Sequence, residues 1–253
     1  MRTVVVSGGG TGIGRAVAQA FAERGEQVVV IGRRAAVLDG AVAAIGRAAP
    51  GAPRVVAVTG DLTRLHDVER VAGEIGERSP TVDVLVHCAG GAIDNRPGWS
   101  PEGEGLAATA ERWLADWRLN VLSTVLLTDA LDDSLASPGG RVVLLSSIAA
   151  YRGSGSYGSA KAALHPLAYH LARELGPRGI TANVVAPGYT VETEFFGEQM
   201  TSARHRMLVD QTATGRPGTP ADVAAAIVWL ASPDACHVTG QIVQINGGAE
   251  LGR

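Results

Sequence analysis

Tyr157 and Lys161 are the residues whose types and spacing best fit acid–base chemistry. They lie four positions apart in SYGSAKAAL, residues 156–164, so on a helix their side chains project from the same face. The phenol of a tyrosine ordinarily has a pKa of about 10 and is a poor base at neutral pH. A nearby ammonium group stabilises the phenolate and lowers that pKa, which would let Tyr157 act as an acid–base catalyst.

Lys161 is the only lysine in a chain that has 22 lysine and arginine residues. A surface pair with i, i+4 spacing would accept arginine as well as lysine. An ammonium group is more compact than a guanidinium group, and its three donors can also bind ribose hydroxyls. The one departure from arginine therefore indicates a specific function for Lys161.

A glycine-rich stretch near the N-terminus could bind phosphate. In VVVSGGGTGIGRAVA, residues 4–18, an apolar run leads through Gly8, Gly12 and Gly14 into a helical pattern. Glycines allow close approach to a pyrophosphate, and the helix start offers free N–H groups. The stretch lacks the G-x-x-x-x-G-K-[ST] pattern of P-loop ATPases, whereas a methyltransferase that binds S-adenosylmethionine remains an alternative. Thr11 and Ile13 complete the predicted cofactor loop.

The end of the second apolar run bears on which dinucleotide would bind. NAD sites usually have an Asp or Glu there for the ribose 2′-hydroxyl, but this chain has Gly32, Arg33 and Arg34. Arginine favours a 2′-phosphate, and we expect no acid close to these arginines. The sequence therefore predicts NADP(H) in preference to NAD(H), with Arg33 as the phosphate ligand. Alternatively, both arginines are simply solvated at the start of a helix.

Asp61 and Leu62 follow the third apolar run, in GDLTR. A carboxylate at this point could accept a hydrogen bond from the adenine amino group. An aspartate that only caps a helix would give the same pattern. Both interpretations remain open on the sequence.

Seven apolar runs rich in β-branched residues alternate with segments of helical periodicity. The runs are 3–7, 27–31, 54–59, 82–87, 141–146, 181–186 and 241–246, and the helical segments include 14–25, 67–78 and 221–232. Each run is nearly continuous, as in parallel strands that are covered on both faces. We therefore expect one α/β domain over residues 1–253: a Rossmann-type doubly wound parallel sheet of about seven strands, flanked by helices on both faces. Ligands should bind at the strand carboxyl ends, where the looser segments 90–106 and 187–207 follow.

The composition fits a protein with a substantial core, because 46% of residues are hydrophobic, 19% are charged and the net charge is −3. The sequence has no basic stripe, so nucleic acid is not an expected partner. It also has no apolar run of membrane-spanning length and no signal-peptide pattern. Cys88 and Cys236 lack the spacing of a zinc site, which favours reduced thiols in a cytoplasmic protein.

Taken together, these motifs resemble the short-chain dehydrogenase/reductase family, and in particular its 3-oxoacyl-ACP reductase-like members. The resemblance covers essentially the whole chain. It rests on SGGGTGIG (7–14), WRLNVLST (117–124), the serine pair 146–147, YGSAK (157–161), APG (186–188) and TGQIVQINGG (239–248). In that family a hydride passes between a nicotinamide and a carbonyl or alcohol carbon.

The resemblance implies a function for each matching residue. Tyr157 would protonate the forming alkoxide, while Lys161 would lower its pKa and hold the nicotinamide ribose. Ser147 would donate a hydrogen bond to the substrate oxygen, and Asn120 would hold a water behind Lys161 in a proton relay. Further cofactor contacts are expected from Ala89 and Gly90 on the adenosine side, from Pro187 and Gly188 over the nicotinamide, and from Thr190 and Thr193 at its carboxamide.

The sequence departs from the family pattern around Ser147. This serine precedes Tyr157 by 10 positions, slightly fewer than is usual. The loop between them is rich in Gly and Ser, so it could still deliver the hydroxyl. Ser146 and Ser154 are the alternative candidates.

Two further departures concern the fourth strand and the helix that carries Tyr157. His87 and Cys88 replace the usual pair of asparagines. Those asparagines brace strand ends, so the change should leave the chemistry alone, and a redox-active Cys88 is a less favoured alternative. Pro166 should kink the helix beyond Lys161. His165 and His170 fit core or interface positions better than catalytic ones.

The segment 189–210 is rich in large apolar residues, which suggests an apolar lid over the substrate. Its candidates are Tyr189, Phe195, Phe196, Met200, Met207 and Leu208, with Trp99 from the other loose segment. Ordinary core packing is the alternative. A lid of this kind is compatible with an apolar carbonyl or alcohol substrate, but does not identify it.

Three functions follow from these patterns. The leading prediction is an NADP(H)-dependent carbonyl reductase, and the second is an NAD-dependent alcohol dehydrogenase of the same family. The third is a dinucleotide-binding protein with weakened catalysis. The resemblance also implies a homotetramer or homodimer that assembles through the helix at 156–176 and the C-terminal strand.

Overall fold

The computed structural model describes residues 1–197 and 200–251. Their strands form one sheet with the order β3-β2-β1-β4-β5-β6-β7, and every neighbouring pair is parallel. The strands are β1 (Thr3–Ser7), β2 (Gln27–Gly32), β3 (Val56–Thr59), β4 (Val84–His87), β5 (Arg141–Leu145), β6 (Thr181–Pro187) and β7 (Ile242–Ile245). The predicted doubly wound parallel sheet is therefore confirmed.

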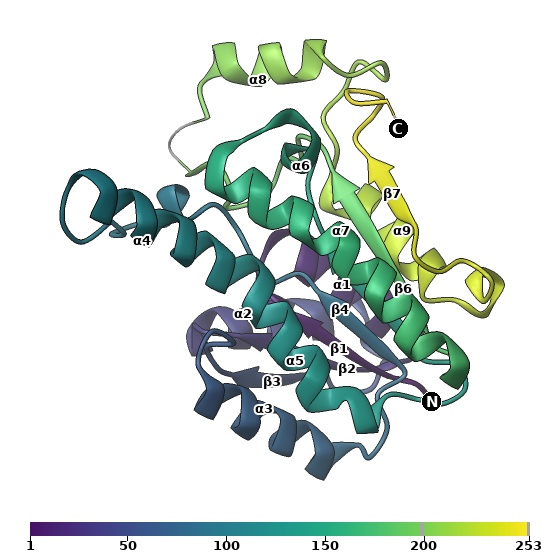
Figure 1. Cartoon of the computed structure of the whole chain (residues 1–253). Coiled ribbons are helices and arrows are strands. Elements are labelled where there is room, and N and C mark those ends of the chain that lie inside the picture. Colours follow the sequence, from purple (N-terminus) through teal and green to yellow (C-terminus); the bar gives the residue numbers. More distant parts are fainter. Residues whose placement is uncertain (198–199, 252–253) are drawn as a thin grey trace.

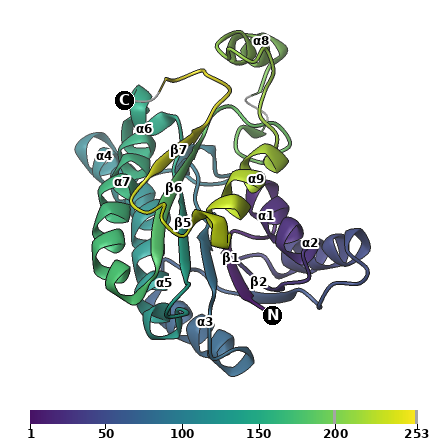
Figure 2. The same cartoon turned by 90° about the vertical axis from the view of Figure 1, so that its right-hand side faces the viewer.

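Helices cover both faces of this sheet, as Figures 1 and 2 show. On one side lie α3 (Leu65–Arg78), α4 (Gly105–Trp117), α5 (Ser123–Leu131) and α7 (Gly155–Leu175). On the other lie α1 (Gly12–Ala22), α2 (Ala35–Ala48) and α9 (Pro220–Leu230). The one-turn helix α6 (Ala149–Arg152) precedes α7, and α8 (Ser202–Asp210) lies at the top of Figure 1.

The continuous apolar strands supply two cores because successive side chains point to opposite faces of the sheet. In β1, Val5 packs with residues of α3, α5 and α7. Its neighbours Val4 and Val6 pack with residues of α1, α2 and α9. All three valines are fully buried. This explains why the strands lack a polar–apolar alternation.

The strand order places a crevice at the carboxyl end of β1. The chain runs outward from β1 to β2 and β3, then returns to place β4 on the other side of β1. The segments that follow β1 and β4 therefore diverge at this point, which is where doubly wound sheets bind their ligands. The glycine-rich turn follows β1, and Ala89 and Gly90 follow β4.

Helix α7 carries both Tyr157 and Lys161 and continues through Pro166 to Leu175. Its start is set by two glycines with left-handed backbone conformations, Gly153 (φ 71°) and Gly155 (φ 57°). Glycine adopts such angles without a steric penalty. These two residues let the chain turn from α6 into α7 within a very short loop.

Candidate active site

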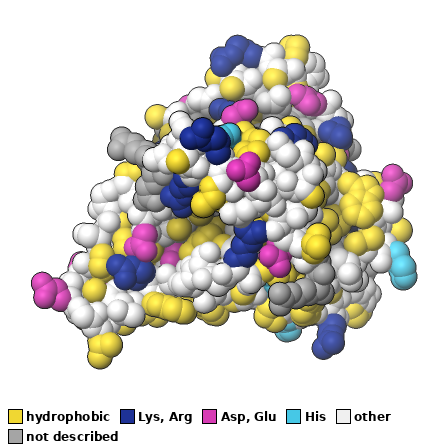
Figure 3. Space-filling view, turned by 90° about the horizontal axis from the view of Figure 1, so that it is seen from above, with side chains coloured by type: hydrophobic (Ala, Val, Ile, Leu, Met, Phe, Trp, Pro, Cys, Tyr) yellow, Lys and Arg dark blue, Asp and Glu magenta, His cyan; other side chains and the backbone are white. Residues whose placement is uncertain are grey.

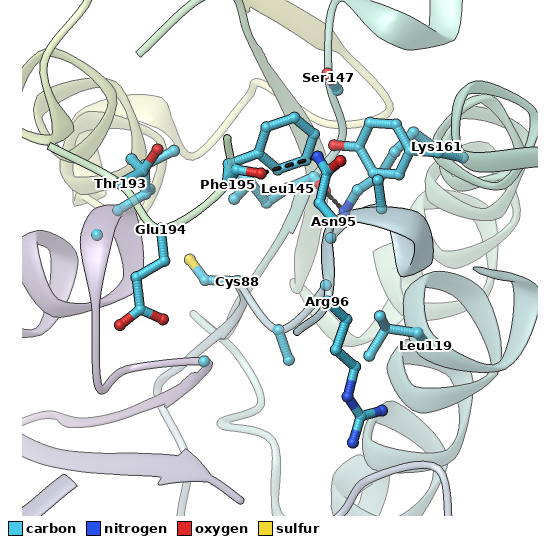
Figure 4. Close-up of a pocket in the computed structure, with 18 of the residues that line it drawn as sticks. Cys88, Asn95, Arg96, Leu119, Leu145, Ser147, Lys161, Thr193, Glu194 and Phe195 are labelled. Atoms are coloured by element: carbon cyan, nitrogen blue, oxygen red, sulfur yellow. Dashed lines mark hydrogen bonds between the residues drawn. The ribbon is translucent and has the colours of Figure 1, made fainter. Parts of the chain in front are cut away.

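A cavity of about 1340 Å³ opens at the carboxyl ends of the strands. Segments that follow β1, β2, β4, β5 and β6 line it. Figure 4 shows the part around Ser147, Lys161 and Phe195. Figure 3 views the molecule from the side of α8, where acidic and basic side chains are interspersed on the surface.

The glycine-rich turn forms one wall of the cavity and packs too tightly for side chains. A Cβ atom on Gly8 would lie 2.7 Å from the Ala89 nitrogen, and one on Gly14 would overlap the Gly8 carbonyl oxygen. Gly8 and Gly12 have left-handed φ angles of 67° and 48°. The predicted loop residues Thr11 and Ile13 also line the cavity. The turn presents bare backbone at the start of α1, which suits a pyrophosphate.

Asp61, Leu62 and Ala89, which the sequence predicts as cofactor contacts, also line the cavity. One carboxylate oxygen of Asp61 accepts hydrogen bonds from the backbone nitrogen and hydroxyl of Thr63, at 3.1 and 2.7 Å. Helix α3 begins later, with Arg64 as its N-cap residue. Asp61 therefore stabilises a local turn and is not the N-cap of this helix.

Three arginines border the cavity near Asp61: Arg33, Arg34 and Arg96. Desolvation and the nearby Arg96 guanidinium lower the pKa of Arg33, while Asp61 acts in the opposite direction. Arg34 forms an exposed ion pair with Glu194 at 2.7 Å. The expectation that no acid lies near these arginines was therefore wrong. Asp61 acts on Arg33, and Glu194 reaches Arg34 from a segment 160 residues away in sequence.

Ser147 and Tyr157 interact although the connection between them is shorter than usual. Ser147 follows β5 and accepts a hydrogen bond from the Ala149 nitrogen at 3.1 Å. Hydrogen bonding by Ser147 also acts on Tyr157, where it opposes the effect of burial on the phenol pKa. The single turn of α6 and the glycines before α7 return the chain to Ser147, so the predicted pair meets at the cavity.

The pKa of Tyr157 is raised to about 12, mainly by burial and further by the Asp116 carboxylate. This is opposite to the direction expected from Lys161 alone. The physical reason is that loss of hydration penalises the phenolate. In addition, the Lys161 ammonium donates a hydrogen bond to the Leu145 carbonyl at 2.7 Å (Figure 4).

Lys161 is only 3% exposed and occupies a confined position. Burial lowers the pKa of its ammonium group to about 8, against opposing effects of Cys88 and Asp116. A Cβ on Gly90 would lie 2.8 Å from the Lys161 Nζ and 2.6 Å from the Asn120 Oδ1. Because Gly90 has no side chain, the Lys161 amine and the Asn120 amide can occupy this space.

Asn120 is completely buried in a π-helical turn, η2 (Arg118–Leu122), that follows α4. Its amide nitrogen donates to the carbonyl oxygens of Gly91 and Asp116, both at 2.9 Å. Its amide oxygen accepts from the Gly91 nitrogen at 3.0 Å. Asn120 thus fixes the backbone next to Gly90, and π-turns of this kind are frequent at functional sites.

Residues at the end of β6 and just after it also line the cavity. Pro187 accepts a hydrogen bond from the Ile148 nitrogen at 2.8 Å, and Gly188 donates to the Ile245 carbonyl at 2.9 Å. The hydroxyls of Thr190 and Thr193 donate to backbone carbonyls at 3.2 and 3.3 Å. All four residues line the cavity, and their contacts with a cofactor stay a prediction.

Aromatic rings from the same segment approach the catalytic candidates. The rings of Phe195 and Tyr157 have centroids 5.3 Å apart, and Asn95 donates to the Phe195 carbonyl at 2.8 Å (Figure 4). Among the predicted lid residues, Tyr189, Phe195, Phe196 and Leu208 line the cavity. Within the described part of the chain, Met200, Met207 and Trp99 do not.

Comparison with known proteins agrees with this architecture. A family model described as enoyl-(acyl carrier protein) reductase matches residues 8–250. The chain belongs to the short-chain dehydrogenase/reductase family. Membership implies a nicotinamide dinucleotide cofactor, and the tight glycine turn described above fits its pyrophosphate.

Proteins similar to this short-chain dehydrogenase/reductase carry different names. The short-chain reductase protein NovJ of Streptomyces niveus is 32% identical over 96% of this chain and 92% of its own length. The 3-oxoacyl-[acyl-carrier-protein] reductase MabA of Mycobacterium avium is 31% identical over 99% and 91%. A solved structure named glucose/ribitol dehydrogenase, from Brucella melitensis, has a TM-score of 0.86 and 30% identity over 99% and 97% of the two chains.

Of the residues that replace the family's paired asparagines, His87 is buried and Cys88 is half-buried, and both are uncharged. His87 pairs with the Thr128 hydroxyl at 2.9 Å, and burial lowers its pKa to about 3. Burial raises the pKa of the Cys88 thiol to about 12, against the effect of Lys161. His87 therefore braces the end of β4 as a neutral ring, and Cys88 is held as a thiol, which argues against redox activity.

The two serines considered as alternatives to Ser147, and the two histidines of α7, make contacts of other kinds. Ser146 donates to the Lys161 carbonyl at 2.9 Å and pairs with His165 Nε2 at 3.0 Å. His170 forms a pair with Glu174 at 2.9 Å on the exposed side of α7. Ser154 is exposed at the start of α7. Ser146 and His165 thus support the helix that carries Tyr157.

Asn95, Arg96 and Asp116 were not singled out from the sequence, although all three line the cavity. Asn95 and Arg96 lie in a Gly- and Pro-rich segment that has no periodic pattern. Asp116 lies in a helix, where a charged residue is ordinarily expected to face solvent. Instead it is 1% exposed.

Metal sites and membrane spans can both be assessed over residues 1–197 and 200–251. Within this part of the chain, no group of three or more His, Cys, Asp or Glu side chains could hold a metal ion. In the same residues, no helix combines the length and the apolar character that crossing a membrane requires.

Proposed function

We propose that this protein is an NADP(H)-dependent oxidoreductase that transfers a hydride between the nicotinamide and a ketone or secondary alcohol, with Tyr157 as general acid–base. One observation carries the proposal: Tyr157, Ser147 and Lys161 line the same cavity as the glycine-rich turn. A bound dinucleotide would therefore lie beside a phenol, a hydroxyl and an ammonium group. The dinucleotide supplies the hydride.

The side chains divide the remaining work by their chemistry. In reduction, the Tyr157 hydroxyl donates a proton to the substrate oxygen, and in oxidation the phenolate accepts it. Ser147 donates a hydrogen bond to the same oxygen and polarises the carbonyl. Lys161 stabilises the phenolate and offers N–H donors to the nicotinamide ribose. Asn120 fixes the adjoining backbone and belongs, in our proposal, to a water-mediated proton relay behind Lys161.

The preference for NADP(H) rests on the arginines at the end of β2. Arg33 and Arg96 line the same cavity and interact electrostatically, and no ion pair of either side chain with a carboxylate is found among the described residues. Two neighbouring guanidinium groups favour an anion between them, and a 2′-phosphate supplies one. Asp61 and Leu62 would bind the adenine nearby.

Replacing Arg33 with alanine should weaken the use of NADPH by about 10- to 100-fold in kcat/KM, because a hydrogen bond to a charged group contributes about 1.5–3 kcal/mol. The use of NADH should change little, since NADH has no 2′-phosphate. Steady-state kinetics with both cofactors measures this. Arg34→Ala is the matched comparison and should have a smaller effect, because Arg34 is paired with Glu194. An equal loss with both cofactors would contradict the assignment of Arg33.

The substrate is proposed to be a small apolar carbonyl compound or the corresponding alcohol, because Phe195, Phe196 and Leu208 line the cavity. A panel of ketones, 3-oxoacyl thioesters, sugars and aromatic carbonyl compounds should be followed by the absorbance of NADPH. Turnover of at least one panel member supports the proposed reaction. If NADPH binds tightly and no panel member is reduced, a dinucleotide-binding protein with weakened catalysis becomes the better interpretation.

An NAD-dependent alcohol dehydrogenase is the second candidate, and one observation favours it. Glu194 neutralises Arg34 at the end of β2, which reduces the positive charge available for a 2′-phosphate. The comparison of NADPH with NADH described for Arg33 separates the two candidates. A preference of the unmodified protein for NADH would favour this second function.

A homotetramer or homodimer in the cytoplasm completes the proposal. Trp113, Leu114 and Trp117 on α4 are about half exposed, as is Tyr169 on the neighbouring α7. Apolar side chains of this size commonly mark protein–protein contacts when they gather on a surface. They support assembly through these helices.

A further inference from the structure

Arg152 joins three segments of the chain at one end of the cavity. It is the last residue of α6, and its guanidinium group donates hydrogen bonds to the side-chain oxygen of Gln211 and to the carbonyl oxygen of Ala249. It also forms an ion pair with Glu250 at 3.4 Å. Arg152, Gln211 and Ala249 all line the cavity, although Gln211 and Ala249 lie 59 and 97 positions from Arg152 in sequence. One side chain thus connects α6, the end of α8 and the C-terminal segment.

The helical turn that carries Arg152 begins directly after Ser147. The Ser147 hydroxyl accepts a hydrogen bond from the Ala149 nitrogen at 3.1 Å, and the Ser147 carbonyl accepts one from the Ala150 nitrogen at 3.0 Å. The Arg152 nitrogen in turn donates to the Ile148 carbonyl at 3.3 Å. The hydroxyl that we propose for the substrate oxygen and the guanidinium that binds the other segments therefore belong to one hydrogen-bonded turn.

The C-terminal segment that Arg152 binds has a defined conformation. The Asn246 side chain is 8% exposed, donates to the Glu250 carbonyl at 2.9 Å and accepts from the Gly248 nitrogen at 2.9 Å. A Cβ on Gly188 would lie 2.7 Å from the Asn246 Cβ, so this turn packs directly on the segment after β6. Arg152 therefore binds a turn whose conformation its own hydrogen bonds already fix.

Helix α8 has little packing of its own and lies at the outer edge of the molecule in Figures 1 and 2. Of its nine residues, all within the described range 200–251, none is buried. Polar contacts at two points connect it to the cavity wall. The Tyr189 hydroxyl pairs with His205 Nδ1 at 2.7 Å, and Arg152 binds Gln211 at the C-terminal end of the helix. A helix with so little buried surface depends on such contacts to keep its place.

We propose that Arg152 is a positioning residue that holds α8 and the C-terminal turn against α6 and so keeps the substrate side of the cavity preformed. This inference rests on the proposed function of the cavity. Without the Arg152 contacts, only a fraction of the molecules has the preformed arrangement, and the apparent substrate affinity falls in proportion to that fraction. Proton transfer by Tyr157 and cofactor binding at the glycine-rich turn stay unchanged.

The test is the Arg152→Ala variant, compared with the unmodified protein on the best substrate of the panel. We expect the KM for the carbonyl substrate to rise about tenfold, because hydrogen bonds from a charged group contribute at least this factor. The kcat and the KM for NADPH should stay within about twofold of the unmodified values, as when an interaction acts on substrate binding alone. An unchanged substrate KM overturns the inference, and so does a loss that is confined to kcat.

Amide hydrogen exchange gives a second measurement that does not depend on activity. In Arg152→Ala, the amides of residues 202–210 should exchange about tenfold faster than in the unmodified protein, while those of β1 keep their rates. If the unmodified protein reduces no carbonyl compound, the proposed function fails, and the exchange rates still decide whether Arg152 holds α8. If the protein is active and the exchange of α8 is the same in both, the inference alone fails.

A direct contact between Arg152 and a charged substrate is the other explanation for a raised KM. A neutral ketone and a keto acid separate the two explanations. Positioning by Arg152 predicts that KM rises by a similar factor for both compounds. A rise that is confined to the keto acid would show direct binding of a carboxylate and would refute the positioning function.

Arg173→Ala is the matched control, because Arg173 is exposed on α7 and, among the residues that the structure describes, is not part of the cavity wall. It should change neither the substrate KM nor the exchange of α8. If Arg152→Ala does not fold, as judged by thermal unfolding, Gln211→Ala removes only the contact with α8. That variant should also speed the exchange of residues 202–210, and unchanged exchange there would count against the inference.

Discussion

Replacing Tyr157 with phenylalanine should reduce kcat by about 10²- to 10⁴-fold, which is the usual contribution of a positioned general acid–base. The substitution removes the hydroxyl that would exchange a proton with the substrate oxygen. The ring stays, so its contact with Phe195, with centroids 5.3 Å apart, should persist. Steady-state kinetics on the best substrate of the panel measures the loss.

Two controls make the loss from Tyr157→Phe interpretable. Thermal unfolding should change by no more than a few degrees, and NADPH should still bind in a fluorescence titration, because the glycine-rich turn is untouched. Tyr151→Phe is the matched variant, since Tyr151 lies in α6 against His165 and does not line the cavity among the described residues. Activity of Tyr157→Phe within tenfold of the unmodified protein would refute the function assigned to Tyr157.

Replacing Lys161 with arginine should remove most of the activity, by about 10²-fold, although the positive charge is kept. The amine is 3% exposed, bonds to the Leu145 carbonyl at 2.7 Å and lies against Gly90 and Asn120. A guanidinium group is too large and too flat for this position, so it must move toward the cavity. Displacements of about 1 Å near reacting groups can cost a factor of 10².

The fold should survive Lys161→Arg because the open cavity next to the amine can accept the longer side chain. Circular dichroism and thermal unfolding check this point. Arg47→Lys, at an exposed position on α2, is the matched exchange between the same two residue types and should leave kcat unchanged. Normal turnover by Lys161→Arg would show that the single lysine of the chain has no special function.

The architecture of the molecule could be predicted because it depends on local patterns. All seven predicted strands are present, and each differs from the observed strand by no more than two residues at either end. The valine runs specify buried strands, and the glycines specify a turn that no other residue fits. Tyr157 and Lys161 were found because their spacing matches one helical turn.

Interactions between distant segments could not be predicted in this way. Glu194 reaches Arg34 across 160 positions, and Asp116 reaches Ser156 across 40. Neither acidic residue has a sequence pattern that distinguishes it from a solvated one. The meeting of Ser147 with Tyr157 likewise depends on left-handed backbone angles at Gly153 and Gly155, which the sequence permits but does not specify.

The pKa of Tyr157 shows where reasoning from a pair of residues is insufficient. The spacing of Tyr157 and Lys161 predicts a lowered pKa, but the folded protein raises it to about 12. Burial removes water from the phenol oxygen and so penalises the phenolate, whereas the ammonium donates its hydrogen bond to the Leu145 carbonyl. The sequence alone does not predict which of these two effects on the pKa is larger, because the effect of burial depends on how much water the surrounding elements exclude.

The lone lysine also makes this protein a simple subject for chemical labelling. Apart from the N-terminus, Lys161 carries the only primary amine in the chain. Its lowered pKa, about 8, leaves an appreciable neutral fraction in mildly alkaline buffer, while its burial limits access to reagents that can enter the cavity. An amine reagent therefore marks one internal position, and the mass of the modified protein reports directly on whether the active site is open.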